Sequence, residues 1–224
     1  MNKQFFITKI FKWIIIFFTP FFVLMISIRL MITPLYAKIE YQMPGFPEDP
    51  FGFTRSDRLT WSEPSINYLV NEEDISFLGA LRFENGDPIY NQRELSHMED
   101  VKIVVRGMRY ALAGTGLILL TSTIYLSTKR NQKTVLRAFY FGAWALIGLI
   151  GVIILFVLVS FNQLFTWFHQ LFFTSGTWTF YTSDTLIRLF PMRFWQDAFL
   201  FVGGLSLLLA AVIIFLTSRR TKKD

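Results

Sequence analysis

The hydrophobic positions of this chain gather into four long apolar stretches. They cover residues 13–32, 108–127, 138–160 and 198–217. About 20 helical residues cross the hydrocarbon core of a bilayer, so each stretch is long enough to span a membrane. The pattern predicts an all-α integral membrane protein with four transmembrane helices.

Three connecting segments of different character separate these stretches. Residues 33–106 form a long segment, residues 128–137 a short basic one, and residues 161–197 one that is rich in phenylalanine. Turn residues such as Pro44 and Gly45, and a helix-start signal at Thr54 with Asp57 three residues later, divide the long segment into short pieces. We therefore predict a small cap of short helices and turns within a single membrane domain.

The basic residues gather on one side of the predicted membrane. Eleven of the 22 Lys and Arg residues lie in the two terminal segments and in residues 128–137, with a single acid, Asp224. Because Lys and Arg are enriched in cytoplasmic flanks, we predict that both termini are cytoplasmic and that residues 33–106 and 161–197 are extracytoplasmic. The net charge of +6 thus reports orientation, and we expect no nucleic-acid partner.

A cleaved signal peptide is the alternative interpretation of residues 13–32. The apolar run is longer than the core of a typical signal peptide, and Leu35 stands where a cleavage site ending at Ala37 would need a small residue. We favour a retained membrane anchor.

The numbers of cysteine and histidine residues limit the reactions that this chain can catalyse. The chain has no cysteine, which excludes a disulfide scaffold, a Cys-ligated metal and a thiol nucleophile. It has only two histidines, so we expect neither a bound metal nor another cofactor.

The first histidine lies on a predicted polar helix. Asn91 with Glu94 three residues later is a helix-start signal, and the helix should run without a break into the second apolar stretch. At helical spacing Arg93, His97 and Asp100 share one face, where a carboxylate can orient an imidazole. An exposed polar helix face is the alternative interpretation.

Aromatic residues surround the second histidine, His169. Its neighbours include Phe165, Trp167, Phe168, Phe172 and Phe173. So apolar a run outside a membrane span predicts an interfacial helix with aromatic side chains at the level of the lipid headgroups. Each outer segment thus holds one histidine beside the membrane, and the two can meet if the segments pack together. An aromatic belt that only anchors helices is the alternative.

The motifs around these residues are similar to those of a known family. They are Phe51-Gly52-Phe53-Thr54-x-x-Asp57-Arg58-Leu59, Arg93-Glu94-x-x-His97-Met98-x-Asp100-Val101, His169-x-x-Phe172-Phe173 and Phe190-Pro191-x-x-Phe194-Trp195. In length, number of spans, order of loops and both histidines, the chain resembles the lipoprotein intramolecular transacylase (Lit) family of Gram-positive bacteria.

The resemblance implies an acyltransferase of the bacterial plasma membrane. Such enzymes act on diacylglyceryl-modified lipoproteins and move the sn-2 acyl chain to the α-amino group of the same cysteine, which gives a lyso-form lipoprotein. The active site would lie at the outer leaflet, in contact with membrane lipid. We expect a monomer.

Two histidines suit this reaction. The amine must lose a proton, and the oxyanion of the tetrahedral intermediate must be stabilised. We expect one of His97 and His169 to take the proton while the other donates to the oxyanion or to the leaving glyceryl oxygen. We favour His169 as the base, since apolar surroundings favour neutral imidazole.

Six further residues are expected to contribute to the site. Asp100, Arg93 and Glu94 are the candidates for supporting the histidines, and Arg58, Phe172 and Trp178 are the candidates for binding substrate.

Three other functions compete with this one. A Ser–His hydrolase would use an outer serine, but the chain has no G-x-S-x-G motif; the candidates are Ser56, Ser62, Ser65, Ser96 and Ser175. His97, His169 and Asp100 would suffice as ligands for zinc. A non-catalytic docking protein would also use aromatic loops. Transport is disfavoured, because the spans carry almost no ionisable residue at mid-depth. Arg29 is the exception, about three residues from the outer end of the first span.

Overall fold

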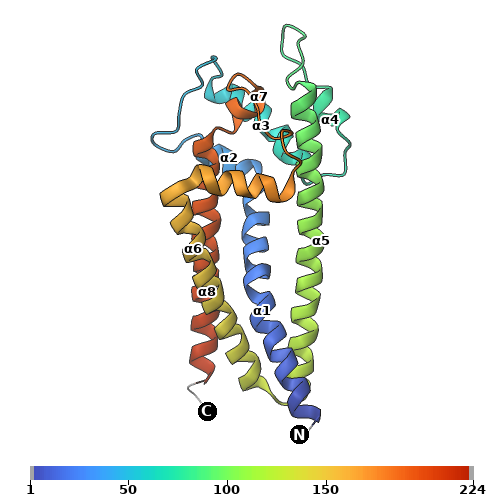
Figure 1. Ribbon diagram of the computed structural model, residues 1–224, viewed down its shortest axis with the longest axis vertical. Coiled ribbons are helices and arrows are strands. Elements are labelled where there is room, and N and C mark those ends of the chain that lie inside the picture. Colours follow the sequence, from blue (N-terminus) through green and yellow to red (C-terminus); the bar gives the residue numbers. More distant parts are fainter. Residues whose placement is uncertain (1–2, 222–224) are drawn as a thin grey trace. The chain divides into compact units, whose positions relative to one another are not determined.

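The computed structural model describes residues 3–221, which fold into helices and divide into two compact units (Figure 1). The first unit comprises Met1–Arg29, Arg109–Phe156 and Leu200–Asp224, and the second comprises Leu30–Met108 and Val157–Phe199. The only strand-like pairing in the described part of the chain is an isolated bridge between Arg82 and Pro88. We call the second unit the cap.

Four helices are long and apolar enough to cross a membrane. They are α1 (Lys3–Met31), α5 (Gln92–Thr128), α6 (Gln132–Phe172) and α8 (Met192–Thr221). The predicted all-α fold with four long apolar helices is confirmed, and the chain is a multi-pass membrane protein.

The first unit is held together by two buried clusters of aliphatic side chains. One joins α1, α5 and α6 around Ile15 and Leu126, and the other joins α1, α6 and α8 around Leu146 and Ala210. Hydroxyl side chains on these helices bond within the unit, as required where no water is available. Ser206 Oγ, for example, lies 3.0 Å from Ser27 Oγ.

The cap contains the short helices α2 (Pro34–Glu40), α3 (Arg55–Tyr68), α4 (Ser76–Gly79) and α7 (Thr185–Leu189), together with the adjoining ends of α5, α6 and α8. Thr54 begins α3 with a complete capping box, in which Asp57 is the partner. Two hydrophobic clusters, one around Tyr68 and Leu78 and one around Tyr36 and Phe194, form its core.

Two features of the long helices place the histidines. α5 runs without interruption from Gln92 through the predicted apolar stretch, which confirms the expected continuous helix. α6 breaks at Ser160, where φ is −154° and ψ is 63°, and continues to Phe172 as a second helical part within the cap. This second part is the helix expected around His169.

Candidate functional site

The two histidines of the chain lie beside each other in the cap. His97 comes from the first turns of α5 and His169 from the second part of α6. Their ring centroids are 6.1 Å apart and the ring planes differ by 20°, and each residue is only 9% exposed. The two imidazoles are therefore neighbours in the cap, close enough to act on the same bound group.

One hydrogen bond fixes the protonation of His169. Its Nδ1 lies 2.8 Å from the carbonyl oxygen of Phe165, one turn earlier on the helix. A carbonyl oxygen only accepts, so Nδ1 carries the proton and Nε2 keeps its lone pair. Burial lowers the pKa of His169, which keeps the ring neutral and its Nε2 basic at neutral pH.

His97 is buried and incompletely paired. Its Nδ1 has no hydrogen-bond partner among the described residues. Burial, together with the neighbouring His169, lowers the pKa of His97 to about 4. Asp100 forms no hydrogen bond to His97 anywhere in residues 3–221, so the expected carboxylate–imidazole pair is not formed.

Aromatic rings border the histidine pair. The contacts come from Phe173 and Phe180 to His97, and from Phe165, Phe168, Phe173 and Trp178 to His169. The ring centroid of Phe173 lies 5.0 Å from that of His97 and 5.5 Å from that of His169. Phe173 therefore bridges the pair.

Of the two aromatic residues predicted to bind substrate, only one contacts a histidine. Trp178 belongs to the site, since its ring centroid is 4.8 Å from that of His169. Phe172 is 46% exposed and packs against Phe168, with ring centroids 5.0 Å apart, without a ring contact to either histidine in the described chain. The sequence pattern did not separate Phe172 from Phe173, because both lie one helical turn after His169. Phe180, in a loop, carried no periodic signal.

Glu94, three residues before His97 on α5, connects two elements of the cap. The side chain is 1% exposed, and its carboxylate accepts from the backbone N–H of Asn91 at 2.8 Å and of Leu186 at 2.7 Å. Burial raises the pKa of this carboxyl. Glu94 thus joins the start of α5 to α7 and holds the first turn of the helix that carries His97.

The two candidate arginines are engaged elsewhere in the cap. Arg93 pairs with Asp184 at 2.9 Å, and its guanidinium lies 5.6 Å from the ring of Phe180, which packs on His97. Arg58 donates to the carbonyl oxygens of Pro47 and Arg188 at 2.6 and 2.9 Å. Neither guanidinium contacts a histidine within residues 3–221.

The alternative chemistries find little support in this geometry. No serine in the described chain hydrogen-bonds to either histidine; Ser62 and Ser65 bond to backbone carbonyl oxygens of their own helix. In the same residues, no three His, Cys, Asp or Glu side chains lie close enough together to hold a metal ion.

Known proteins share this sequence pattern and this fold. The sequence model of the family described as lipoprotein intramolecular transacylase Lit matches residues 13–195. A protein of Aquifex aeolicus (strain VF5), described as uncharacterized, is 28% identical over 212 residues, which are 92% of this chain and 93% of that protein.

Solved structures agree with the fold. The membrane-integral lipoprotein intramolecular transacylase Lit from Bacillus cereus superposes with a TM-score of 0.71 over 97% of this chain and 98% of its own, at 19% identity. A histidine-to-alanine variant of that protein gives a TM-score of 0.69, at 20% identity, over 98% of this chain and 96% of its own.

Proposed function

Because this chain belongs to the lipoprotein intramolecular transacylase (Lit) family, and is therefore an acyltransferase, we propose that it moves an acyl chain within a bacterial lipoprotein. The donor is the sn-2 ester of the diacylglyceryl group on the N-terminal cysteine, and the acceptor is the α-amino group of the same cysteine. The product is an N-acylated, monoacylglyceryl lipoprotein.

The observation that carries this proposal is the neutral histidine pair. The free Nε2 of His169 accepts a proton from the α-amino group as its nitrogen attacks the ester carbonyl carbon. The carbon–oxygen bond to the glyceryl group then breaks, the amide bond remains, and the proton passes to the glyceryl oxygen. His97 donates a hydrogen bond to the oxyanion or to the leaving glyceryl oxygen.

An intramolecular reaction needs no covalent enzyme intermediate. Donor and acceptor belong to one molecule, so holding them in a reactive geometry supplies an effective concentration that free reactants never reach; about 10⁵–10⁸ M is known for well-oriented groups. This agrees with a chain that has no cysteine and, in the part described, no serine bonded to a histidine.

The proposal includes the placement of the site. Eleven basic residues and one acid lie in the terminal segments and residues 128–137, which orients these parts toward the cytoplasm. The cap then lies outside, with the histidine pair at the outer leaflet of the plasma membrane, where lipid-anchored lipoproteins are found. A single copy of the chain contains both histidines, so a monomer suffices.

Mass spectrometry of a reporter lipoprotein tests the function. The N-terminal lipopeptide is compared after expression with and without this protein, in cells that supply the diacylglyceryl form. Transfer keeps the total mass and moves one acyl group onto the amine, which fragmentation reveals.

Two other results of this mass-spectrometric test would contradict the proposed acyl transfer. Loss of one acyl mass identifies a hydrolase instead of a transacylase. An unchanged lipopeptide, with a reporter that another transacylase of the family converts, identifies a docking protein. Either result overturns the proposal.

A further inference from the structure

One indole nitrogen beside the histidine pair has no partner. Four buried side-chain atoms lack a hydrogen bond in the described chain, namely Glu40 Oε1, Asp49 Oδ1, His97 Nδ1 and Trp178 Nε1. The two carboxylate oxygens belong to groups whose second oxygen is bonded. The two nitrogens both lie at the histidine pair, and the indole N–H has no second atom with which to form a hydrogen bond.

Leaving such a donor buried and unpaired is costly. The desolvation penalty is about 1–3 kcal/mol, and a buried indole N–H normally finds an acceptor. The ring of Trp178 lies 4.8 Å from that of His169, so the unpaired donor belongs to a ring in contact with the proposed base.

A tight turn positions this indole. Gly176 has φ +87°, a conformation that favours glycine. Thr177 donates both its backbone N–H and its hydroxyl to the carbonyl oxygen of Thr174, at 3.2 and 2.9 Å. The indole is thus held by a hydrogen-bonded turn, as a donor for a developing charge should be.

We propose that Trp178 Nε1–H binds the carbonyl oxygen of the acyl group that is transferred, and stabilises the oxyanion formed when the amine attacks. This inference rests on the proposed acyl transfer and extends it. Arg58 and Arg93, the charged alternatives, already bond within the cap. With Trp178 at the oxyanion, His97 donates to the leaving glyceryl oxygen.

The test replaces the N–H and keeps the aromatic ring. Trp178→Phe and wild type are purified as full chains in detergent and assayed with a synthetic diacylglyceryl lipopeptide. We expect kcat to fall about 100-fold, KM to change less than about threefold, and the thermal midpoint to be unchanged. A structural role would instead lower the midpoint or raise KM.

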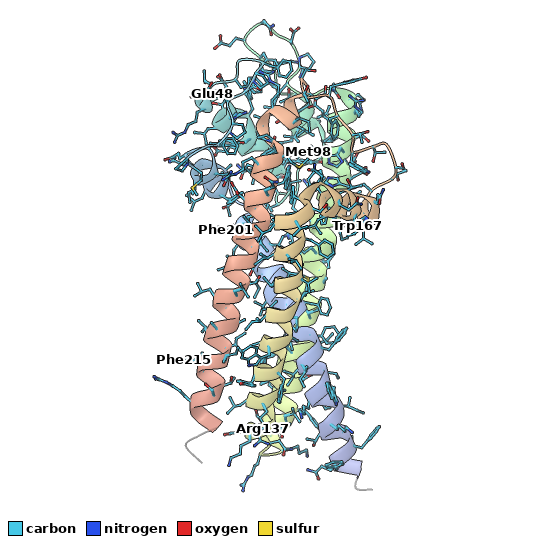
Figure 2. All side chains as sticks on the ribbon, turned by 60° about the vertical axis from the view of Figure 1, so that its left-hand side comes forward. Glu48, Met98, Arg137, Trp167, Phe201 and Phe215 are labelled. Atoms are coloured by element: carbon cyan, nitrogen blue, oxygen red, sulfur yellow. The ribbon has the colours of Figure 1, made fainter. Side chains whose placement is uncertain are left out.

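Trp167→Phe is the matched control. Trp167 is 48% exposed on the second part of α6, the part that carries His169, and it lies at the edge of the cap, whereas Met98 lies in its interior (Figure 2). We expect the control to keep the wild-type kcat. A Trp178→Phe enzyme with kcat within threefold of wild type overturns the inference and leaves the proposed function intact.

A second measurement uses the unsubstituted protein. The six tryptophans give indole N–H signals in ¹⁵N-labelled protein, and that of Trp178 is identified by its contact with the His169 ring. A lipopeptide whose amine is blocked binds without reacting, and we expect it to shift this signal downfield. Absence of the shift overturns the inference. If the blocked lipopeptide shifts the Trp178 signal but the unblocked lipopeptide is not converted, Trp178 is a hydrogen-bond donor to the ligand and the proposed acyl transfer is refuted.

Discussion

His169 donates its Nδ1 proton to the carbonyl oxygen of Phe165 over 2.8 Å, so the nitrogen that faces away from this bond has a lone pair. The two histidines therefore differ in their hydrogen bonding, because Nδ1 of His97 has no partner in the described chain. It also indicates which substitutions each position should tolerate.

We predict different responses to glutamine at the two positions. Alanine at either histidine should lower the transfer rate by about 10²–10⁴-fold. Glutamine offers an N–H donor but no base, so His97→Gln should be more active than His97→Ala, whereas His169→Gln should match His169→Ala. The lipopeptide assay measures all four rates. If glutamine restores activity only at position 169, then His169 is the hydrogen-bond donor and His97 is the base.

Direct titration tests the protonation of both rings. With only two histidines, ¹³C-labelled imidazoles give two resolved signals, which the two glutamine variants assign. Burial penalises the charged ring, so we expect His97 to titrate near pH 4 and His169 below its ordinary value. A ring that protonates at or above pH 6.5 would contradict this arrangement.

The lowered pKa of His97 has a consequence for stability. Between about pH 4 and the ordinary value near 6.5, the unfolded cap binds a proton that the folded cap excludes. Stability therefore falls as the pH falls through this window. His97→Gln should reduce the difference in thermal midpoint between pH 4.5 and pH 7.5, while Trp167→Phe should leave it unchanged.

Glu94 should matter more for stability than its neighbour Arg93. Each carboxylate oxygen of Glu94 accepts one backbone N–H, and glutamine would place an NH₂ group against one of these donors. We expect Glu94→Gln to destabilise the cap by about 1–3 kcal/mol and Arg93→Ala by less than about 1 kcal/mol. Thermal unfolding and hydrogen exchange of the Leu186 amide measure the two losses of stability. A larger loss in Arg93→Ala than in Glu94→Gln would refute this structural role of Glu94.

Gly142 tests the packing of the first unit. A methyl group at this position would lie 2.8 Å from Thr19 Cβ and 3.2 Å from the carbonyl oxygen of Ile16. We expect Gly142→Ala to destabilise the helices by about 1–3 kcal/mol. Gly148→Ala, where nothing lies within 4 Å, should be neutral or slightly stabilising; equal unfolding midpoints would contradict this packing.

The sequence predicted those features that depend on length and local pattern. The four apolar stretches predicted four long helices, and the helix-start signal at Asn91 and Glu94 predicted the start of α5. Both histidines stood out because they are rare and lie beside the spans. These properties need no knowledge of which residues meet.

The partners of the polar groups were not predictable in this way. Glu94 bonds to the backbone of Leu186, and a backbone N–H leaves no mark in a sequence. Arg58 was expected to bind substrate and Arg93 to support the histidines, yet both guanidinium groups bond to other residues of the cap. Trp178 was a candidate for binding substrate, but the sequence does not show that its indole nitrogen lacks a hydrogen-bond partner in the described chain.

The aromatic border of the histidine pair bears on the fidelity of the proposed reaction. Phe173 contacts both rings, and Phe165, Phe168, Phe180 and Trp178 contact one or the other. Such walls leave few places for water, which competes with the amine for the same ester carbonyl. The acyl group should therefore pass to the amine of its own lipoprotein and should seldom be lost by hydrolysis as free fatty acid.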